Sequence, residues 1–362
     1  MNLETMHQSA HQSQPIEATG IDSAAILPVA FQDWFDTQGW VPHDHQLHML
    51  AAARQDHHAL LIAPTGGGKT LAGFLPTLIE LTDTNWDGVH TLYVSPLKSL
   101  TQDIHRNLEA PISGLDLSIT LETRTGDTPQ TKRQRQRRKP PNILLTTPES
   151  LALLLSYHDA HRIFHKTRRV VVDEIHAIAG TKRGDQLALC LARIQKLSPR
   201  CQRVGLSATV AWPEALAGWL SPDADPSSVT RIVGTDGAEP RVQILETGEP
   251  MPWSSHSALH AMADVYEAIK QAETTLIFVN TRAFAEMAFQ ALWKLNEEGL
   301  PIALHHGSLE KELRRRVEAE MAAGKLRAVV ATSSLDLGVD WASVDLVIQV
   351  GAPKGVSRLI QR

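Results

Sequence analysis

The sequence predicts an α/β protein made of two tandem lobes, each a parallel sheet with helices on both faces. Short apolar runs alternate with longer amphipathic segments from Phe31 onward. The short runs are continuously apolar, which is typical of strands buried on both faces in a parallel sheet. The segment SPDADPSSV (221–229) interrupts this rhythm with Pro, Asp and Ser, after which a second α/β series begins.

The first lobe is predicted from five apolar runs and the amphipathic segments between them. Expected strands cover residues 60–63, 91–94, 142–146, 169–172 and 203–206. Expected helices include 69–81 and 184–197, where apolar residues recur at helical spacing.

The second lobe repeats the pattern and sets the domain boundaries. Expected strands cover residues 241–245, 275–279, 302–305, 327–331 and 346–350, with helices at 283–295 and 309–323. Residues 1–24 are rich in His, Gln, Ser and Thr and predict a disordered leader. We therefore expect a first domain at 25–222, a linker at 223–240 and a second domain at 241–362.

Composition narrows the class of protein. The formal net charge is −5, which argues against a uniformly basic coat for nucleic acid. No apolar run approaches the ~18 residues that span a bilayer, and no signal peptide precedes the first lobe, so we expect no membrane partner. Cys190 and Cys201 are the two cysteines, which excludes a disulfide framework and favours the cytoplasm.

The basic run KRQRQRRK (132–139) is interpreted equally well as a solvated face or as a phosphate contact.

Five histidines near the start of the first lobe are interpreted as having no metal-binding function. The histidines at 43, 45, 48, 57 and 58 lack cysteines or carboxylates at ligand spacing. We therefore expect exposed histidines here and no metal site.

A glycine-rich turn between an expected strand and helix predicts a phosphate site. Glycines let backbone amides approach phosphate oxygens, and the helix N-terminus adds positive potential. Lys69 would contact the β- and γ-phosphates of ATP, and the Thr70 hydroxyl would bind Mg²⁺. Ala63 replaces the first glycine of the general pattern G-x-x-x-x-G-K-[ST]. The candidate nucleotide-binding residues of this turn are Thr65, Gly66, Gly67, Gly68, Lys69 and Thr70.

The segment VVVDEIH (170–176) supplies the carboxylates that ATP hydrolysis needs. Asp173 and Glu174 follow an apolar strand, at the sheet edge where parallel sheets bind ligands. We predict that this strand neighbours the P-loop strand, that Asp173 holds Mg²⁺, and that Glu174 positions the attacking water. An exposed acidic turn is the alternative interpretation.

Taken in order, the motifs resemble those of superfamily 2 DExH-box helicases. The matching strings are APTGGGKT (63–70), DEIH (173–176), SAT (207–209), FVNTR (278–282), HHGSL (305–309) and ATSSLDLGVD (331–340). YVSPLKSL (93–100), RTGDT (124–128), LLTTPESL (144–151) and APKGVSRLIQR (352–362) resemble the Lhr-like branch, most of all the DNA-ligase-associated DEXH helicases of bacteria. The resemblance implies two RecA-like lobes. Ile175 departs from it, because Trp is expected there.

The resemblance implies roles for further residues, and those assigned to nucleic-acid contact are explained equally well as turn or helix-cap residues. Gln46 would recognise adenine, Gly338, Asp340 and Arg362 would approach the nucleotide, and His176 and Gln361 would assist catalysis. Ser207, Ala208 and Thr209 would couple the nucleotide site to the second lobe. Nucleic-acid contacts would come from Pro96, Lys98, Arg124, Thr125, Gly126, Thr147, Pro148, Glu149, Arg282, His306, Gly307 and Thr332.

The function implied by the resemblance is ATP-dependent 3′→5′ movement on single-stranded DNA in DNA repair. A monomer with a functional link to an ATP-dependent DNA ligase and repair nucleases is expected. In the resembling family the residues after the positions of Gln361 and Arg362 are A-G-R-S-G, and they include an arginine finger. We therefore expect a chain that is truncated within motif VI, with an incomplete second lobe. One alternative is a module that binds ATP and single strands with little hydrolysis; another is an RNA-dependent ATPase.

Overall fold

The chain forms two compact units, Met1–Gly237 and Ala238–Arg362. The computed structural model describes residues 16–17, 26–64, 67–82, 84, 86–96, 98–208, 210, 212–234, 241–245, 247–248, 258–332, 335 and 344–352. Each unit is built on its own parallel sheet, as the sequence predicts, so the fold class is confirmed.

The first unit contains an eight-stranded, wholly parallel sheet in the order β1-β8-β2-β7-β6-β3-β5-β4. Its strands are β1 (Ile16–Glu17), β2 (His58–Ile62), β3 (Thr91–Val94), β4 (Leu121–Arg124), β5 (Ile143–Thr146), β6 (Arg169–Val172), β7 (Gln202–Ser207) and β8 (Val229–Val233). In the register Val94 pairs with both Thr146 and Val172, and Ile62 pairs with Ser207. The carboxyl ends of these strands therefore meet along one edge of the sheet.

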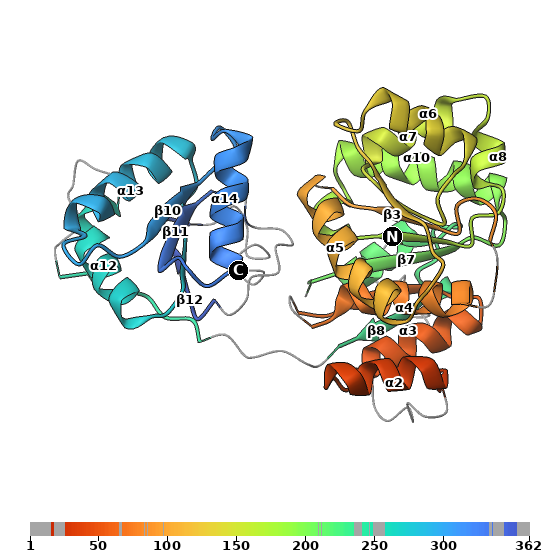
Figure 1. The fold of residues 1–362 in the computed structure, drawn as a ribbon, viewed down its shortest axis with the longest axis horizontal. Helices are drawn as coiled ribbons and strands as arrows, with labels where there is room; N and C mark the ends of the chain where they lie inside the picture. Colours follow the sequence, from red (N-terminus) through yellow and green to blue (C-terminus); the bar gives the residue numbers. More distant parts are fainter. Residues whose placement is uncertain are drawn as a thin grey trace, which may run out of the picture. The chain divides into compact units, whose positions relative to one another are not determined.

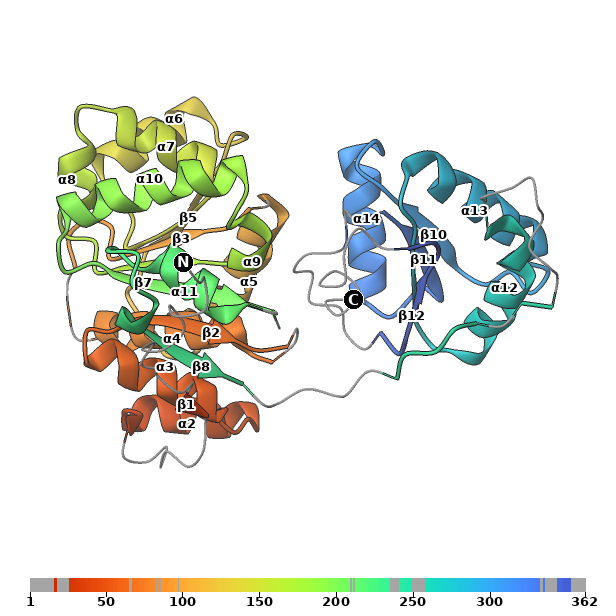
Figure 2. The ribbon, with the colours of Figure 1, turned by 180° about the vertical axis from the view of Figure 1, so that it is seen from behind.

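Helices cover both faces of this sheet, because each central strand sends alternate apolar side chains to opposite sides. In β2, Leu61 belongs to the core with α2 (Val29–Gln38), α3 (Asp44–Arg54), α4 (Lys69–Thr82) and α5 (Lys98–Gly114). Leu60 belongs to the core with α7 (Pro148–Ser156), α8 (Ala160–Phe164), α9 (Ile175–Ile178), α10 (Lys182–Leu197) and α11 (Pro213–Leu220). Figures 1 and 2 show the two layers, with α3 and α4 below the sheet and α7, α8 and α10 above it. The remaining helices of this unit are α6 (Gln130–Arg138) and the short η1 (Pro226–Ser228).

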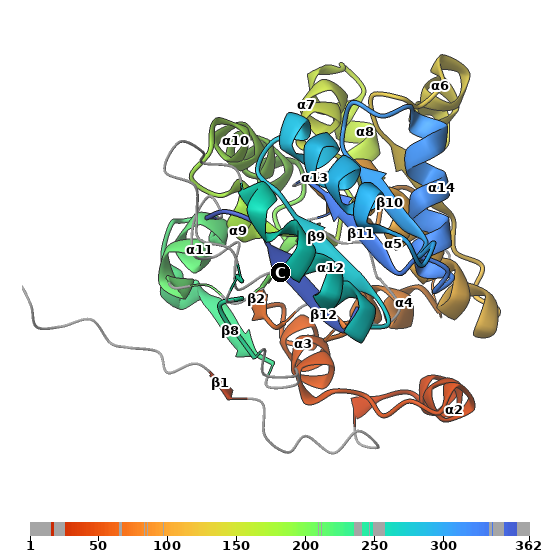
Figure 3. The same cartoon turned by 90° about the vertical axis from the view of Figure 1, so that its left-hand side faces the viewer.

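The second unit is a smaller version of the same architecture. Its parallel sheet has the order β10-β11-β9-β12. The strands are β9 (Thr275–Phe278), β10 (Ile302–His305), β11 (Ala328–Ala331) and β12 (Leu346–Gln349), and the helices are η2 (Ala258–Ala261), α12 (Met262–Gln271), α13 (Arg282–Leu295) and α14 (Lys311–Ala322). Ile277 packs with α12 and α13, whereas Phe278 packs with α14 on the other face. Figure 3 shows α12 and α13 on one side of this sheet.

Three sequence predictions about boundaries are wrong. Val229–Val233, expected inside the linker, forms β8 and pairs with β2. Ile16–Glu17, expected inside a disordered leader, pairs with β8. Residues 241–245, expected to be a strand, have no regular secondary structure, and Val242 and Ile244 are 74% and 92% exposed. Pairing with a strand distant in sequence decided each case.

The sequence also missed β4, whose first three residues are only half-buried at the edge of the sheet. Among the helices of the described residues, none combines the length and the apolar character that crossing a bilayer requires.

Candidate nucleotide site and adjacent loops

The carboxyl edge of the first sheet gathers the residues of the predicted nucleotide site. The P-loop follows β2, and Asp173 follows β6. These strands are not neighbours as predicted, because β7 pairs with both and lies between them. The insertion of β7 places Ser207 between the P-loop strand and the acidic strand, so Ser207 is in reach of the residues after β6.

Lys69 begins α4, and its side chain is held inside the P-loop. Its Nζ donates hydrogen bonds to the carbonyl oxygens of Ala63 and Pro64, both at 2.9 Å. Burial lowers the pKa of Lys69, and the nearby Glu174 and Asp173 carboxylates oppose that shift. The ammonium therefore lies in the field of both acids. Thr65 and Gly66 lie outside the described residues.

Gly68 has a backbone conformation and a neighbour that require glycine. Its φ is +68°, in the left-handed region. A Cβ at this position would lie 2.7 Å from Nε2 of Gln46. The same nitrogen lies 3.4 Å from the Gly68 carbonyl oxygen, to which it donates a hydrogen bond. The side chain of Gln46 therefore packs directly against the P-loop.

Gln46 is positioned by the first turn of α3. It forms a capping box in which Oε1 accepts a hydrogen bond from the backbone N–H of His43 at 3.0 Å. His43 stacks on His45, with ring centroids 5.2 Å apart. His45 is 1% exposed, so the expectation of an exposed histidine is wrong here. A Cβ on Gly234, which follows β8, would lie 3.0 Å from Nδ1 of His45, so β8 buries this ring.

Asp173 and Glu174 form a buried acidic pair. They are 6% and 7% exposed, and Glu174 has a φ of 48°, a conformation that non-glycine residues adopt mainly at special sites. Asp173 accepts hydrogen bonds from the Tyr93 hydroxyl and, at 2.9 Å, from the backbone N–H of Glu174. Burial, reinforced by the charge of Asp173, raises the pKa of Glu174 to about 8. Burial also raises the pKa of Asp173.

This pair fits a magnesium–nucleotide complex. Oε2 of Glu174 is buried and accepts no hydrogen bond from a described residue, although Nε2 of His176 lies within ion-pair distance of it. Burial raises the pKa of both carboxyl groups in spite of the nearby Lys69 ammonium, so a bound cation would add positive charge where the pair needs it. Asp173 and Thr70 offer the oxygen ligands that Mg²⁺ prefers. Thr70 stands beside Lys69 in the first turn of α4. Within the described residues no cluster of three or more His, Cys, Asp and Glu side chains suggests any other metal site.

His176 connects the acidic pair to β7. Its Nε2 lies 3.3 Å from Oε2 of Glu174, and its Nδ1 lies 3.1 Å from Oγ of Ser207. Ser207 in turn donates a hydrogen bond to the Ala208 carbonyl oxygen at 2.9 Å. The three side chains form a continuous polar path at the sheet edge. Thr209 lies outside the described residues, and Ile175 is fully buried in the apolar core.

Arg183, which the sequence did not single out, joins two of the predicted nucleic-acid loops. It lies in the first turn of α10 and donates hydrogen bonds to the Pro96 carbonyl oxygen at 2.9 Å and to Oε1 of Glu149 at 2.6 Å. These acceptors follow β3 and begin α7. No motif marks Arg183, because only the packing of α10 brings it to both loops.

The loop after β4 is organised by a second missed residue, Arg133. Its Nη2 donates to the carbonyl oxygens of Thr125 and Gly126, at 3.1 and 2.5 Å. Arg124 is 2% exposed and donates to the Arg133 carbonyl oxygen at 3.0 Å. Arg124 is therefore turned inward, and Gly126 is the exposed residue of the three predicted contacts.

The loop after β5 is short and leads directly into α7. This helix begins at Pro148, with Thr147 as its N-cap residue. Proline is favoured in the first helical turn because its missing N–H has no partner there. Thr147 and Pro148 are both buried. The side chain of Lys98 lies outside the described residues.

The predicted contacts of the second unit follow the carboxyl ends of its strands. Arg282, in the first turn of α13, donates to Oγ of Ser308 at 2.6 Å. His306 follows β10, is 2% exposed and lies 3.3 Å from Oε1 of Glu286. Thr332 follows β11. A Cβ on Gly307 would contact Arg282 at 3.6 Å, so the first two loops pack together.

Four further predicted residues are not placed. Gly338, Asp340, Gln361 and Arg362 lie outside the described residues. Their expected roles therefore stay predictions.

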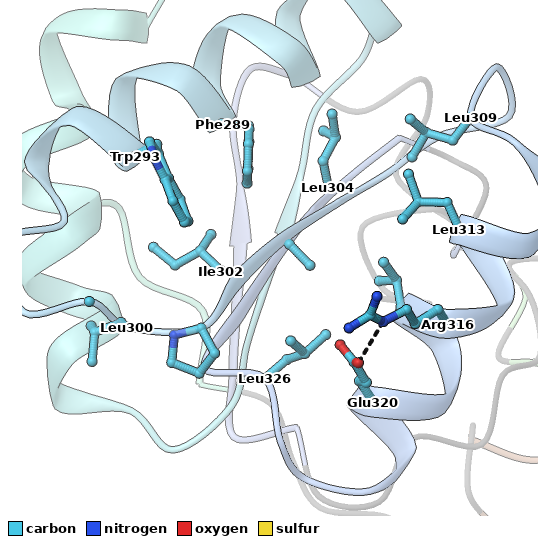
Figure 4. A pocket seen from close by; sticks show the side chains of 14 residues that line it. Phe289, Trp293, Leu300, Ile302, Leu304, Leu309, Leu313, Arg316, Glu320 and Leu326 are labelled. Atoms are coloured by element: carbon cyan, nitrogen blue, oxygen red, sulfur yellow. Dashed lines mark hydrogen bonds and ion pairs between the residues drawn. The ribbon is translucent and has the colours of Figure 1, made fainter.

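An apolar groove of about 500 Å³ lies elsewhere, in the second unit (Figure 4). Trp293 and Phe289 of α13 stack at 5.8 Å along one side, and the ion pair between Arg316 and Glu320 of α14 lies at the other. None of the predicted site residues lines this groove. Its apolar walls do not suit a nucleotide, so the nucleotide site is assigned by the chemistry of the P-loop and not by the size of this hollow.

Comparison with known proteins shows which family the chain resembles. A DEAD/DEAH box helicase domain matches residues 43–216, and a helicase conserved C-terminal domain matches residues 257–362. The Lhr helicase and probable uracil glycosylase of Mycolicibacterium smegmatis is 37% identical over 95% of this chain and 26% of its own length. The ATP-dependent helicase Lhr-Core protein 2 of Thermococcus barophilus is 35% identical over 96% of this chain and 42% of its own length.

A solved structure agrees with these sequence matches. The structure of Mycobacterium smegmatis helicase Lhr bound to ssDNA and AMP-PNP superposes with a TM-score of 0.78 and 38% identity, covering 92% of this chain and 45% of that one. This chain thus spans less than half the length of each of these relatives.

Proposed function

Because the chain belongs to the DEAD/DEAH box helicases and is similar to Lhr-type members, we propose that it is an ATP-driven motor acting on single-stranded DNA. The observation that carries the proposal is the arrangement at the carboxyl edge of the first sheet. Lys69, the acidic pair and the path from His176 to Ser207 meet there. An ATPase coupled to a second lobe requires a phosphate grip, a water-positioning acid and a connecting path at one edge.

In the proposed reaction each residue of the edge has a distinct task. Lys69 leaves the carbonyl oxygens of Ala63 and Pro64 and pairs with the β- and γ-phosphates. Asp173 and Thr70 hold Mg²⁺, which supplies neutralisation of the phosphate charge when it is bound. Glu174 orients the attacking water and accepts its proton. The positive field of a bound cation favours the ionised carboxylate that this task requires.

The polar path of Glu174, His176 and Ser207 explains how hydrolysis of ATP can affect residues beyond the nucleotide site. His176 contacts Glu174 on one side and Ser207 on the other. A change in the charge of Glu174 changes the hydrogen bonding of His176, and Ser207 receives that change at the end of β7. We propose that the path continues through Thr209 to the second lobe.

The proposed nucleic-acid contacts suit a phosphate backbone. Backbone groups, hydroxyls and cations at strand ends grip phosphates without reading bases. The relative solved with ssDNA supports single-stranded DNA as the partner. The 3′→5′ direction, the role in DNA repair and the link to a DNA ligase rest on the family resemblance and are proposed on that ground. The cytoplasmic location is proposed from the two cysteines of the chain, and a monomeric state is proposed with it.

Turnover of ATP, measured with and without single-stranded DNA, tests the proposed function. We expect Mg²⁺-dependent hydrolysis that the single strand raises, and loss of that hydrolysis in Glu174→Gln with retained ATP binding. Hydrolysis that single strands fail to raise would favour the module that binds ATP and strands without turnover. Stronger stimulation by RNA of the same sequence would favour the RNA-dependent ATPase.

A further inference from the structure

Three segments of the first unit concentrate positive charge in a chain whose net charge is −5. Residues 135–139, 158–168 and 196–200 contain nine Lys and Arg residues and a single acidic residue, Asp159. Seven of the nine cations are exposed. We call these three segments the basic band.

Hydrogen bonds place the three segments side by side. Nη2 of Arg162 donates to the Arg137 carbonyl oxygen at 2.6 Å, which joins the end of α6 to α8. Oγ of Ser198 donates to the Thr167 carbonyl oxygen at 2.8 Å, which joins the end of α10 to the segment after α8. The band is therefore continuous across three elements.

The band lies at the opposite edge of the sheet from the nucleotide site. Its segments lead directly into β5, β6 and β7, so they lie at the amino ends of those strands. Figure 2 shows α8 at one end of the first unit and α9, which follows the acidic pair, at the other. The proposed single-strand contacts of this unit all lie at the α9 end, so they leave the band unexplained.

Acidic neighbours neutralise only part of this charge. Arg135 pairs with Glu122, and Asp159 binds Arg137 at 3.0 Å and Arg162 at 3.8 Å. Asp56 pairs with Arg168. The remaining exposed cations that form no ion pair with a described residue are Arg138, Lys139, Lys166, Lys196 and Arg200. Like charges gathered in this way repel one another, and a polyanion that spans them relieves the repulsion.

The scarcity of large aromatic rings indicates which polyanion fits. Sites for single strands combine cations with aromatic rings on which bases stack. In the band Phe164 is fully buried, and beside the band the guanidinium of Arg137 covers the Tyr157 ring at 4.1 Å. The exposed rings of His161 and His165 stack on each other at 5.3 Å, so each covers one face of the other. The band therefore offers cations with no exposed Phe, Tyr or Trp ring, which suits a backbone whose bases are already paired.

We propose that the basic band binds the phosphate backbone of double-stranded DNA, as a second nucleic-acid surface separate from the single-strand path. This proposal adds a duplex contact to the proposed motor and does not depend on ATP hydrolysis. It also assigns a ligand to the end of the KRQRQRRK run.

The test removes one unpaired cation from each segment, in Arg138→Gln/Lys166→Gln/Arg200→Gln. A matched control removes three exposed, unpaired cations of the second unit, in Lys294→Gln/Arg315→Gln/Lys325→Gln. Binding of a blunt 20-base-pair duplex is measured by fluorescence anisotropy across salt concentrations. Each lost phosphate contact lowers the slope of log K against log salt by about 0.9. We expect the band variant to lower the slope by about 2 to 3 and the duplex affinity at least roughly tenfold at 0.1 M salt.

Three results would overturn the proposal. The first is an equal slope for the band variant and the control, with equal melting temperatures showing that both fold. The second is an equal loss of affinity for a single strand of the same length, which would place the band in the single-strand path. The third is that poly-glutamate, added at the same total charge as the duplex, displaces the duplex from the protein. Stimulation of ATP turnover by single strands should be the same in the band variant as in the wild type. If single strands do not stimulate the wild type either, that result counts against the proposed function and not against the duplex contact.

Discussion

The Tyr93 hydroxyl donates a hydrogen bond to Oδ2 of Asp173, from the end of the neighbouring strand β3. Burial, followed by the charge of Asp173, raises the pKa of Tyr93 well above its usual value, so the phenol stays a donor. The bond lowers the pKa of Asp173 against the opposing effect of burial. Tyr93 therefore helps to keep the proposed Mg²⁺ ligand ionised.

We expect Tyr93→Phe to weaken Mg²⁺ binding. A hydrogen bond to a charged group contributes about 1.5–3 kcal/mol, so the Mg²⁺ concentration for half-maximal ATP turnover should rise roughly tenfold or more at pH 7. The difference should shrink as the pH is raised above 7, because a higher pH favours ionisation of Asp173 whether or not Tyr93 donates to it. Titration of Mg²⁺ at pH 7 and at a higher pH checks this, and a deficit that is independent of pH would contradict the role given to Tyr93.

The raised pKa of Glu174 predicts a pH-dependent stability of the nucleotide-free chain. The folded pKa is about 8 and the ordinary value is 4.5, so the folded state binds the extra proton between these values. Stability from this group is thus full below about pH 4.5 and declines as the pH rises toward 8. Glu174→Gln should raise the melting temperature by several degrees at pH 9 and little at pH 5. Asp36→Asn, at an exposed acid that forms no ion pair with a described residue, is the control and should change neither value.

Arg183 should affect nucleic-acid binding without affecting basal hydrolysis. Its bonds to Pro96 and Glu149 hold two loops together, and removing them in Arg183→Ala should cost about 1–2 kcal/mol of single-strand affinity. The single-strand concentration that half-saturates ATP turnover should rise about 5- to 30-fold. Turnover without DNA should match the wild type. Arg193→Ala, an exposed arginine of the same helix, should behave as the wild type.

Gly68→Ala should impair ATP binding for two reasons that a control separates. Alanine at position 68 would have to adopt a positive φ, and its Cβ would lie 2.7 Å from Nε2 of Gln46. Gly39 has nearly the same φ, +67°, with no atom within 4 Å of a Cβ. Gly39→Ala should therefore show only the backbone strain, about 1 kcal/mol of stability, with ordinary ATP affinity. Equal ATP affinities in both variants, measured by titration, would contradict the close packing of Gln46 on the P-loop.

An ion pair between the buried Arg169 and the half-buried Glu80 lies at the amino edge of the first sheet. Arg169 is fully buried and binds Glu80 at 2.9 Å and Gln202 at 2.7 Å. Burial raises the pKa of Glu80, but its bond to His90 and the charge of Arg169 outweigh this and bring it to about 2. The stabilisation from Glu80 is therefore present above about pH 4.5 and is lost as the pH falls toward 2.

Breaking one partner of that pair leaves the other charge buried. Glu80→Gln should lower the free energy of unfolding by about 3–5 kcal/mol at pH 7, measured by urea denaturation. The deficit should be smaller at pH 3, where the wild type has lost part of the stabilisation from ionised Glu80. A deficit of the same size at both pH values would show that packing, and not charge, holds the site.

The fold class and the nucleotide chemistry were predictable because local patterns carry them. A continuous apolar run identifies a strand buried on both faces, and β3 and β6 coincide with such runs and are buried throughout. The P-loop and the acidic pair are recognised because each needs a particular order of residue types directly after a strand. These features depend on neighbours in the sequence.

Other parts of the site depend on contacts between distant segments. The position of β7 between β2 and β6 places Ser207 beside His176, and no local pattern encodes that strand order. β8 is a strand because β2 offers it a partner, whereas the equally apolar residues 241–245 have none in the described structure.

The sequence by itself thus determined that the chain has two α/β lobes with a P-loop and a carboxylate pair. The tertiary structure decided which residues surround them. Arg183 reaches its loops, and Gln46 reaches Gly68, only because α10 and α3 pack where they do. The physical reason is that a strand or a phosphate loop is specified by backbone geometry and nearest neighbours. Side-chain partners across a sheet edge are specified by the packing of the whole core.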